Sequence, residues 1–409
     1  MMKKTASLVI LTLLCLVAIL SPAPVQAQGI SVLGSSAQAD FPASLNFSLS
    51  ARSGGSITEA RLHYQVDRES FADVTSEVFV DFTPGPIVNL QYSLDMRRTG
   101  GLPPGSKVTY WWTLRDNSGG TVATAPTTVP FDDTRYQWRQ LTGGKVTLYW
   151  YQGDNTFAQA LMAAVQDGLQ RLARNTGAAP ERPAYLYVYA SAGDLQGAMI
   201  YPQEWTGGVA YTSYSTMAIG IAPDNLVWGE RAITHELTHL VVHQITMNPY
   251  NDLPTWLDEG LAMYTEGLLE PQFGTPLHQA VTTDSLISVR SLASPFSAFT
   301  GESILSYAQS YSLVEFLVSR YGQPKMLEML NTFRQGSTYD GALQKVYGFD
   351  QDGLNTRWRE YVRQQYQVAG GGQPQALAPA TAAPPAAVTT RLLMAPGLTT
   401  AESAWRQGR

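Results

Sequence analysis

The hydrophobic periodicity of the 409-residue chain changes along its length, and this change limits the folds it can adopt. Up to about residue 132, apolar and polar residues alternate in short runs such as 45–49 and 60–66, a pattern typical of half-buried strands, and residues 108–114 are predicted to form a strand rich in aromatic residues. From 226 to about 366 the apolar residues recur with helical spacing. The pattern predicts an all-β domain followed by a domain whose second half is mostly helical.

Turn-rich segments separate the strand-like runs of residues 29–132, which favours an immunoglobulin-like or fibronectin-like β-sandwich. Residues 133–367 are predicted to form an α+β domain, because segments with a strand-like pattern at 146–151 and 185–189 alternate with a helix-length segment at 157–174. A further segment with a strand-like pattern follows at 207–221. In the helical half, breaks are expected at the prolines Pro249, Pro254, Pro271, Pro276, Pro295 and Pro324.

The first 27 residues have the layout of a signal peptide: Lys3 and Lys4 precede an apolar run at 6–20, and cleavage is expected after Ala27. An uncleaved membrane anchor is the alternative, but the run is shorter than the roughly 20 residues that a spanning helix needs. We therefore expect a secreted protein with no membrane span after cleavage. At the other end, residues 368–409 contain too little large apolar surface to fold alone and are predicted to form a flexible tail.

Charge and cysteine content exclude some functions. The formal net charge is -6, and no cluster of Lys and Arg follows the first four residues, which disfavours nucleic acid or an anionic membrane as the main partner. The only cysteine, Cys15, lies in the apolar run of the signal peptide. The mature chain would therefore have neither disulfides nor a thiol nucleophile.

The strongest chemical signal is the segment His-Glu-Leu-Thr-His at 235–239, within an amphipathic stretch at 224–246. On a helix, His235 and His239 differ by only about 40° in azimuth and about 6 Å in height, so their imidazoles can meet at one metal ion. His243 continues this register but lies about 12 Å along the axis from His235, and so it cannot share that ion. A packing role, or a hydrogen bond to a carboxylate of the next helix, is expected for it.

A catalytic zinc site needs a third protein ligand and an open position for water. Glu259 follows His239 by twenty positions, on a second predicted helix that begins near Pro254 and folds back against the first. Thr255 and Asp258 have the spacing of a capping box at its start, although Asp258 is also a candidate acceptor for a histidine ring nitrogen. One Zn²⁺ is expected on His235, His239 and Glu259, with Glu236 as general base.

These motifs resemble those of gluzincin zinc metallopeptidases, most closely the peptidase MA-like proteins of bacterial secretomes, over about residues 134–366. The resemblance implies a thermolysin-like α+β catalytic domain that hydrolyses peptide or protein substrates. It also implies a tyrosine that steadies the oxyanion, for which Tyr307 in Ser-Tyr-Ala-Gln-Ser-Tyr is the candidate and Tyr311 the alternative. A ring packed in the core is the other reading of Tyr307. Where thermolysin-like enzymes have a histidine acceptor, four residues past the glutamate, this chain has Met263.

The resemblance further implies that 207–221 contains an edge strand that aligns the substrate. Aminopeptidases place a carboxylate there, but between Trp205 and Gly229 the only acidic residue is Asp224. An endopeptidase is therefore favoured, although Glu204 could still supply that carboxylate. The alternative function is a surface binding or adhesion protein that uses the metallopeptidase fold as a non-catalytic scaffold.

Overall fold

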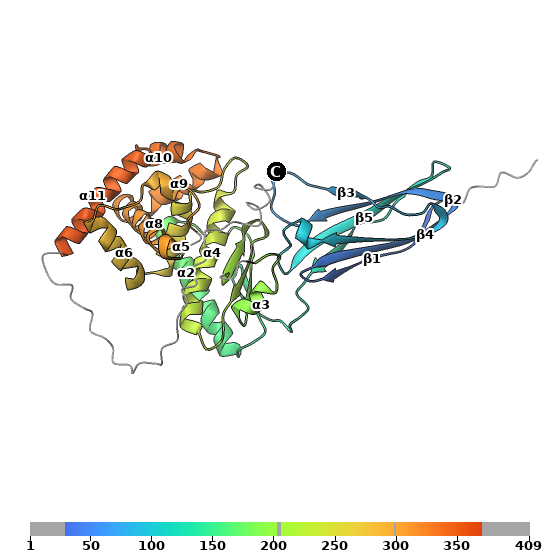
Figure 1. The fold of residues 1–409 in the computed structure, drawn as a ribbon, viewed down its shortest axis with the longest axis horizontal. Coiled ribbons are helices and arrows are strands. Elements are labelled where there is room, and N and C mark those ends of the chain that lie inside the picture. The colour runs from blue at the N-terminus through green and yellow to red at the C-terminus, as the bar shows by residue number, and fades with distance from the viewer. Residues whose placement is uncertain (1–28, 203–205, 298–299, 370–409) are drawn as a thin grey trace, which may run out of the picture.

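The computed structural model describes residues 29–202, 206–297 and 300–369. It consists of an N-terminal β region, residues 31–131, and an α/β region, residues 139–369, whose second half is helical (Figure 1). This arrangement confirms the predicted fold class in outline. The predicted signal peptide and Cys15 lie outside the described residues, as do Glu204 and the chain after 369.

The β region is organised around one long strand, β2 (Ser44–Val66). Its register shifts between Arg52 and Ile57; the part before the shift pairs mainly with β1 and β4, and the part after it with β3 and β5. All these pairings are antiparallel, and β6 and β7 join the sheet through β5. The other strands are β1 (Ser31–Asp40), β3 (Ser76–Phe79), β4 (Gly85–Asp95), β5 (Ser106–Asp116), β6 (Thr121–Ala123) and β7 (Thr127–Phe131).

The core of the β region follows from the alternation seen in the sequence. Leu45, Phe47 and Leu49 are buried on the first part of β2, and Leu62 on the second part belongs to the same core as Trp112 of β5. Both parts of β2 therefore line one hydrophobic core. The finer assignment to an immunoglobulin-like or fibronectin-like class stays a prediction.

The α/β region contains a five-stranded sheet in the order β11-β12-β10-β9-β8. Strand β10 is parallel to its neighbours β9 and β12, whereas β11 and β8 are antiparallel edge strands. The predicted strand at 207–221 is thus two strands, joined by the short 3-10 helix η2 (Thr212–Tyr214). The bounds are β8 (Arg139–Gly143), β9 (Val146–Trp150), β10 (Ala184–Tyr189), β11 (Gly208–Tyr211) and β12 (Thr216–Gly220).

Helices cover one face of this sheet and the β region covers the other, as the side chains of β10 show. Leu186 and Val188 point into the core shared with the helices, whereas Tyr187 and Tyr189 join the core of the β region. Because successive strand residues point to opposite faces, one strand links the two cores. Helices α2 (Asn155–Thr176) and α4 (Leu226–Thr246) lie on the helical side, and the β region lies on the other (Figure 1).

Beyond α4 the chain is helical, and most prolines lie at or between helix ends as expected. Pro276 is the exception, because it lies inside α6 and does not end it. Helix α11 continues two residues past the predicted domain end at 367. None of the helices in the described ranges is long and apolar enough to cross a membrane. The helices are α3 (Ala192–Gln196), α5 (Thr255–Glu266), α6 (Pro271–Thr282), α7 (Val289–Leu292), α8 (Thr300–Tyr321), α9 (Gln323–Arg334), α10 (Tyr339–Tyr347) and α11 (Gln351–Ala369).

Candidate metal centre

Helix α4 carries the histidine motif, and it is buried on most of its circumference because it lies between the sheet and α5. His235, Glu236 and His239 are all buried, with exposed fractions of 9%, 4% and 1%. Ring centroids of the two histidines are 4.9 Å apart, as the helical spacing predicts. A buried helix face therefore presents two imidazoles and one carboxylate together.

Helix α5 brings the third candidate ligand to these histidines. It begins at Thr255 directly after Pro254, and Glu259 in its second turn is 2% exposed. The adjacent Gly260 lies against α8, where a Cβ atom would stand 2.4 Å from the carbonyl oxygen of Ser310. A glycine is needed at this position because α5 and α8 approach so closely. The approach also places α8 beside the site.

The nitrogen and oxygen atoms of the three residues are spaced as metal ligands. His235 Nε2 and His239 Nε2 lie 3.4 Å and 3.7 Å from Glu259 Oε2. Roughly 3.4 Å separates neighbouring ligands in a tetrahedral zinc site with bonds of about 2.1 Å. Although buried, His235 Nε2 and Glu259 Oε2 make no hydrogen bond. Buried polar atoms rarely stay unpaired, so a cation fits this donor set.

Each histidine is oriented through its other ring nitrogen. His235 Nδ1 lies 2.7 Å from Glu266 Oε1, and His239 Nδ1 lies 2.9 Å from Asp258 Oδ1. Donation from Nδ1 to a carboxylate leaves Nε2 as the unprotonated nitrogen, which is the form that binds a metal. The expected acceptor position, Met263, is a buried apolar residue and takes no part.

Sequence reasoning missed Glu266 and assigned Asp258 only in part. Glu266 follows Glu259 by seven positions, close to two helical turns, so it lies on the same face of α5; this spacing was the available signal. The capping-box prediction is wrong, because Pro254 is the N-cap of α5 and no side chain caps the helix. The Asp258 carboxylate instead contacts two histidines of α4.

Both carboxylates have a second, cationic partner. Asp258 Oδ2 accepts a hydrogen bond from His243 Nε2 at 3.0 Å, which confirms the expected bond between His243 and a carboxylate of the next helix. Glu266 Oε2 accepts from Arg231 Nη2 at 2.8 Å, and Arg231 is also paired with Glu270. His239, Asp258 and His243 form a second cluster of metal-ligand type. Its contacts are hydrogen bonds, and Nδ1 of His239 must keep its proton for Nε2 to bind a metal.

The charges of the site favour a cation. Burial lowers the pKa of His235, but the neighbouring Glu259 and Glu266 carboxylates outweigh it and raise that pKa well above its usual value. Burial likewise lowers the pKa of His239, and Asp258 raises it overall. Burial raises the pKa of Glu236, against the opposing effect of the two histidines. With both histidines neutral, as metal binding requires, the surrounding carboxylates would leave this buried space negatively charged, and a divalent ion would offset that charge.

The two tyrosines proposed from sequence have different surroundings in the structure. Tyr307 is 3% exposed, and burial together with Glu259 and Glu236 raises the pKa of its phenol. Its ring also packs edge-on against Phe296. Tyr311 instead pairs with the ring of Tyr264, and its pKa is raised by burial and by Glu315, away from the site. Of the two phenols, only that of Tyr307 is influenced by the carboxylates of the site.

Strand β11 is the sheet edge next to this centre. Among the described residues it pairs only with β12, so its other edge is open in the sense that no other described strand pairs with it. Gly208 lies against the Glu236 side chain, because a Cβ atom there would stand 3.0 Å from Glu236 Oε1. The open edge therefore starts beside Glu236.

Comparison with known protein families gives a match over most of the α/β region. Residues 164–364, which include the complete centre, match the model of the Peptidase MA superfamily. This match supports the predicted resemblance to metallopeptidases at the level of the superfamily. No curated protein sequence matches the chain.

Three solved structures show a distant similarity to this chain. An aminopeptidase A from Legionella pneumophila, in complex with aspartic acid, has 10% identity and a TM-score of 0.37, over 81% of this chain and 50% of that chain. An aminopeptidase N family protein from Idiomarina loihiensis has 10% identity and a TM-score of 0.27, over 78% and 68%. A β-1,3-glucan binding domain of carbohydrate-binding module family 56 has 18% identity and a TM-score of 0.16, over 24% and 96%.

Proposed function

We propose that this protein is a secreted zinc-dependent peptidase in which His235, His239 and Glu259 hold one zinc ion. The observation that carries the proposal is the convergence of these three buried residues, two of whose facing atoms make no hydrogen bond. Two imidazoles and one carboxylate are the donor set of a catalytic zinc site. The superfamily match of residues 164–364 supports a peptidase over other uses of such a site.

Glu236 is proposed as the general base and Tyr307 as the residue that steadies the oxyanion. A bound zinc ion would polarise the scissile carbonyl and lower the pKa of the attacking water. Glu236 is buried beside the histidines, and its raised pKa suits a group that takes a proton from water and passes it to the leaving amine. The phenol of Tyr307 would donate to the developing negative charge, which its raised pKa allows at neutral pH.

We further propose that the enzyme cleaves within chains. The open edge of β11 can bind an extended peptide as an added strand beside Glu236. No side chain of β11 carries a carboxylate that would bind a substrate amine, since this strand reads Gly-Val-Ala-Tyr. An aminopeptidase needs such a group, whereas an endopeptidase does not.

The first experiment measures zinc content and hydrolysis of unfolded casein, with and without a chelator. The wild type should bind one zinc per chain and lose activity with the chelator. Glu236→Gln should keep the zinc and lose hydrolysis by at least about 10³-fold, because it removes the base and none of the ligands. A zinc-loaded wild type that cleaves neither casein nor a peptide library would sink the proposal and favour the binding scaffold.

The role of Tyr307 has a matched control on the same helix. Tyr307→Phe should lower kcat by about 10²-fold, with zinc content unchanged, as expected for loss of one oxyanion donor. Tyr311→Phe removes an equivalent hydroxyl one turn away and should change kcat little. Equal effects of the two substitutions would show that Tyr307 only packs in the core.

A further inference from the structure

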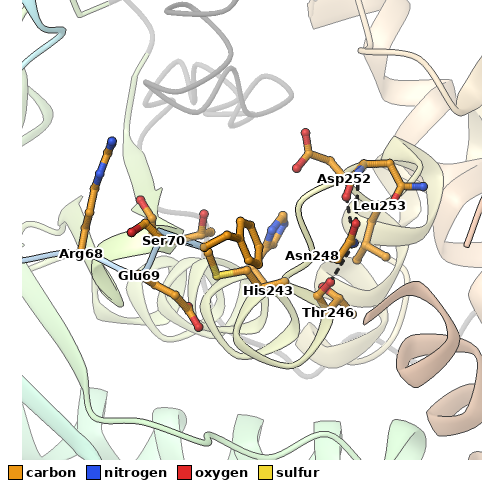
Figure 2. A pocket seen from close by; sticks show the side chains of 13 residues that line it. Arg68, Glu69, Ser70, His243, Thr246, Asn248, Asp252 and Leu253 are labelled. Atoms are coloured by element: carbon orange, nitrogen blue, oxygen red, sulfur yellow. Dashed lines mark hydrogen bonds between the residues drawn. The ribbon is translucent and has the colours of Figure 1, made fainter. Parts of the chain in front are cut away.

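A polar pocket of about 170 Å³ lies where the β region meets the C-terminal end of α4. Its walls come from both regions of the molecule. Figure 2 shows Arg68, Glu69 and Ser70 on one side, Asn248 and Asp252 on the other, and His243 between them. Binding pockets are often found at such junctions between domains.

The pocket lies at the far end of the open edge strand. Strand β11 begins at Gly208, beside Glu236, and leads into Thr212 and Ser213, which line the pocket. At about 3.3 Å per residue, the path from Gly208 to Thr212 is roughly 13 Å long. A peptide paired with β11 would therefore reach the pocket about four residues from the bond at Glu236.

The loop from the β region is held in place at this point. The backbone N–H of Glu69 donates to the carbonyl oxygen of Ser213 at 2.8 Å, and the Glu69 carboxylate is paired with Arg182. The backbone of Arg182 in turn donates to the side chain of Gln244 on α4. This wall of the pocket is thus fixed both to η2, which directly follows β11, and to the helix of the metal centre.

We propose that this pocket is a remote substrate subsite, which binds residues of an extended polypeptide about four positions from the cleaved bond. The inference rests on the proposed peptidase function. Ten of the thirteen lining residues are polar. The side chains of Ser70, Thr246 and Asn248 already bond to carbonyl oxygens of nearby residues. Thr212 and Asp252 are therefore the lining groups that suit the main chain of a peptide. The substrate class is therefore unfolded polypeptide that extends at least four residues to one side of the cleaved bond.

The test measures binding of a labelled peptide series to zinc-loaded Glu236→Gln by fluorescence anisotropy. One cleavable core is extended by two, four or six residues, at one end or the other. Extension past about four residues at one end only should lower Kd by about tenfold, as expected when several polar contacts are added to a pre-formed site. Equal Kd values along both series would overturn the proposal.

A pocket-filling substitution and a matched control locate the effect. Ser70→Trp, made in the zinc-loaded Glu236→Gln variant, would fill the pocket from an exposed loop position, and it should abolish the tenfold gain. Val74→Trp places the same ring on the same loop, at a residue that is 58% exposed and does not line the pocket. It should keep the gain. A gain that persists in Ser70→Trp would place the contact elsewhere and overturn the subsite.

The results that would contradict the subsite differ from those that would contradict the peptidase function. If zinc-loaded wild type cleaves the short core but shows no effect of peptide length, the peptidase function stands and the subsite is wrong. If no peptide is cleaved, yet the longer peptides bind Glu236→Gln and the wild type more tightly, the subsite stands as a peptide-binding site and the peptidase function is wrong.

Discussion

On each of two sides of the metal centre, a histidine contacts a carboxylate, but the second partner of that carboxylate differs between the sides. On the Asp258 side, His239 contacts Asp258, which contacts His243. On the Glu266 side, which is formed by His235, Glu266, Arg231 and Glu270, the imidazole contacts a carboxylate that is paired with a guanidinium. One series ends in a histidine, whose charge depends on pH, and the other in a guanidinium, which stays charged.

The sides also differ in how firmly the carboxylate is held. Asp258 lies between two histidines of α4, and although burial opposes it, these histidines hold the pKa of its carboxyl well below the usual range. Glu266 has one histidine and Arg231, whose side chain is 32% exposed and also reaches Glu270. Arg231 can therefore move if Glu266 changes, whereas the two histidines around Asp258 cannot. We infer that the Asp258 side tolerates less change.

The largest expected effect tests this difference directly. Asp258→Asn should weaken zinc binding by about 100-fold, because the amide has one oxygen for two histidine donors and its NH₂ group faces the other donor. Glu266→Gln should weaken it by only about tenfold, since the amide oxygen can face His235 while Arg231 turns to Glu270. Competition with a chromogenic chelator measures both affinities.

Far-UV circular dichroism of both variants serves as the folding control for this pair. A Glu266→Gln variant that loses as much zinc affinity as Asp258→Asn, or more, would show that the Glu266 side is the more rigid one.

Zinc affinity is expected to depend on pH. The pKa values of His235 and His239 are raised above about 6.5, so at neutral pH protons compete for the nitrogens that zinc needs. Zinc affinity should therefore rise with pH above about 6.5, by about tenfold per pH unit for each proton displaced, and level off above the raised values. Chelator competition from about pH 6 to about pH 9 measures this profile. Asp258→Asn should flatten it more than Glu266→Gln does, and a flat wild-type profile would contradict the protonation argument.

The parts of the centre that sequence predicted are those set by local helix geometry. His235 and His239 are one turn apart on a single helix, and Pro254 starts the helix that carries Glu259. The expectation that His243 does not share an ion with His235 follows from the rise per residue alone. The change from strand to helix periodicity likewise predicted the two regions, because the alternation on β2 and β5 reflects burial on one face.

The parts that sequence could not predict depend on how helices pack. Asp258 has capping-box spacing from Thr255, and only the approach of α5 to α4 shows that it contacts histidines instead. Glu266 becomes a partner of His235 through the same approach, which Gly260 and the contact with α8 allow. The loop at Glu69 reaches the α/β region from a different part of the chain, and no local pattern encodes such a contact.

A smaller effect is expected at the end of the Asp258 side. His243→Leu removes the donor to Asp258 Oδ2 but keeps the contact between Asp258 and His239, so zinc affinity should fall by about fivefold. His243→Gln can still donate a hydrogen bond and should recover most of this loss, which simple packing at the site would not require. Titration calorimetry of both variants measures the difference. If the two variants bind zinc equally, His243 does not act through Asp258.

The smallest effect is expected at Arg231. Arg231→Met removes the charge next to Glu266 and keeps most of the aliphatic stem, and His235 keeps its carboxylate partner. Because the guanidinium is partly exposed, its charge is screened by solvent, and zinc affinity should change by no more than about threefold at low salt. The change should fade at about 1 M salt, whereas the effect of His243→Leu should persist, since that contact is more buried. Affinities of both variants at low and high salt make this comparison. A larger, salt-resistant loss in Arg231→Met would mean that Glu266 cannot hold His235 without its guanidinium partner, and the two sides would then be equally dependent on their terminal cations.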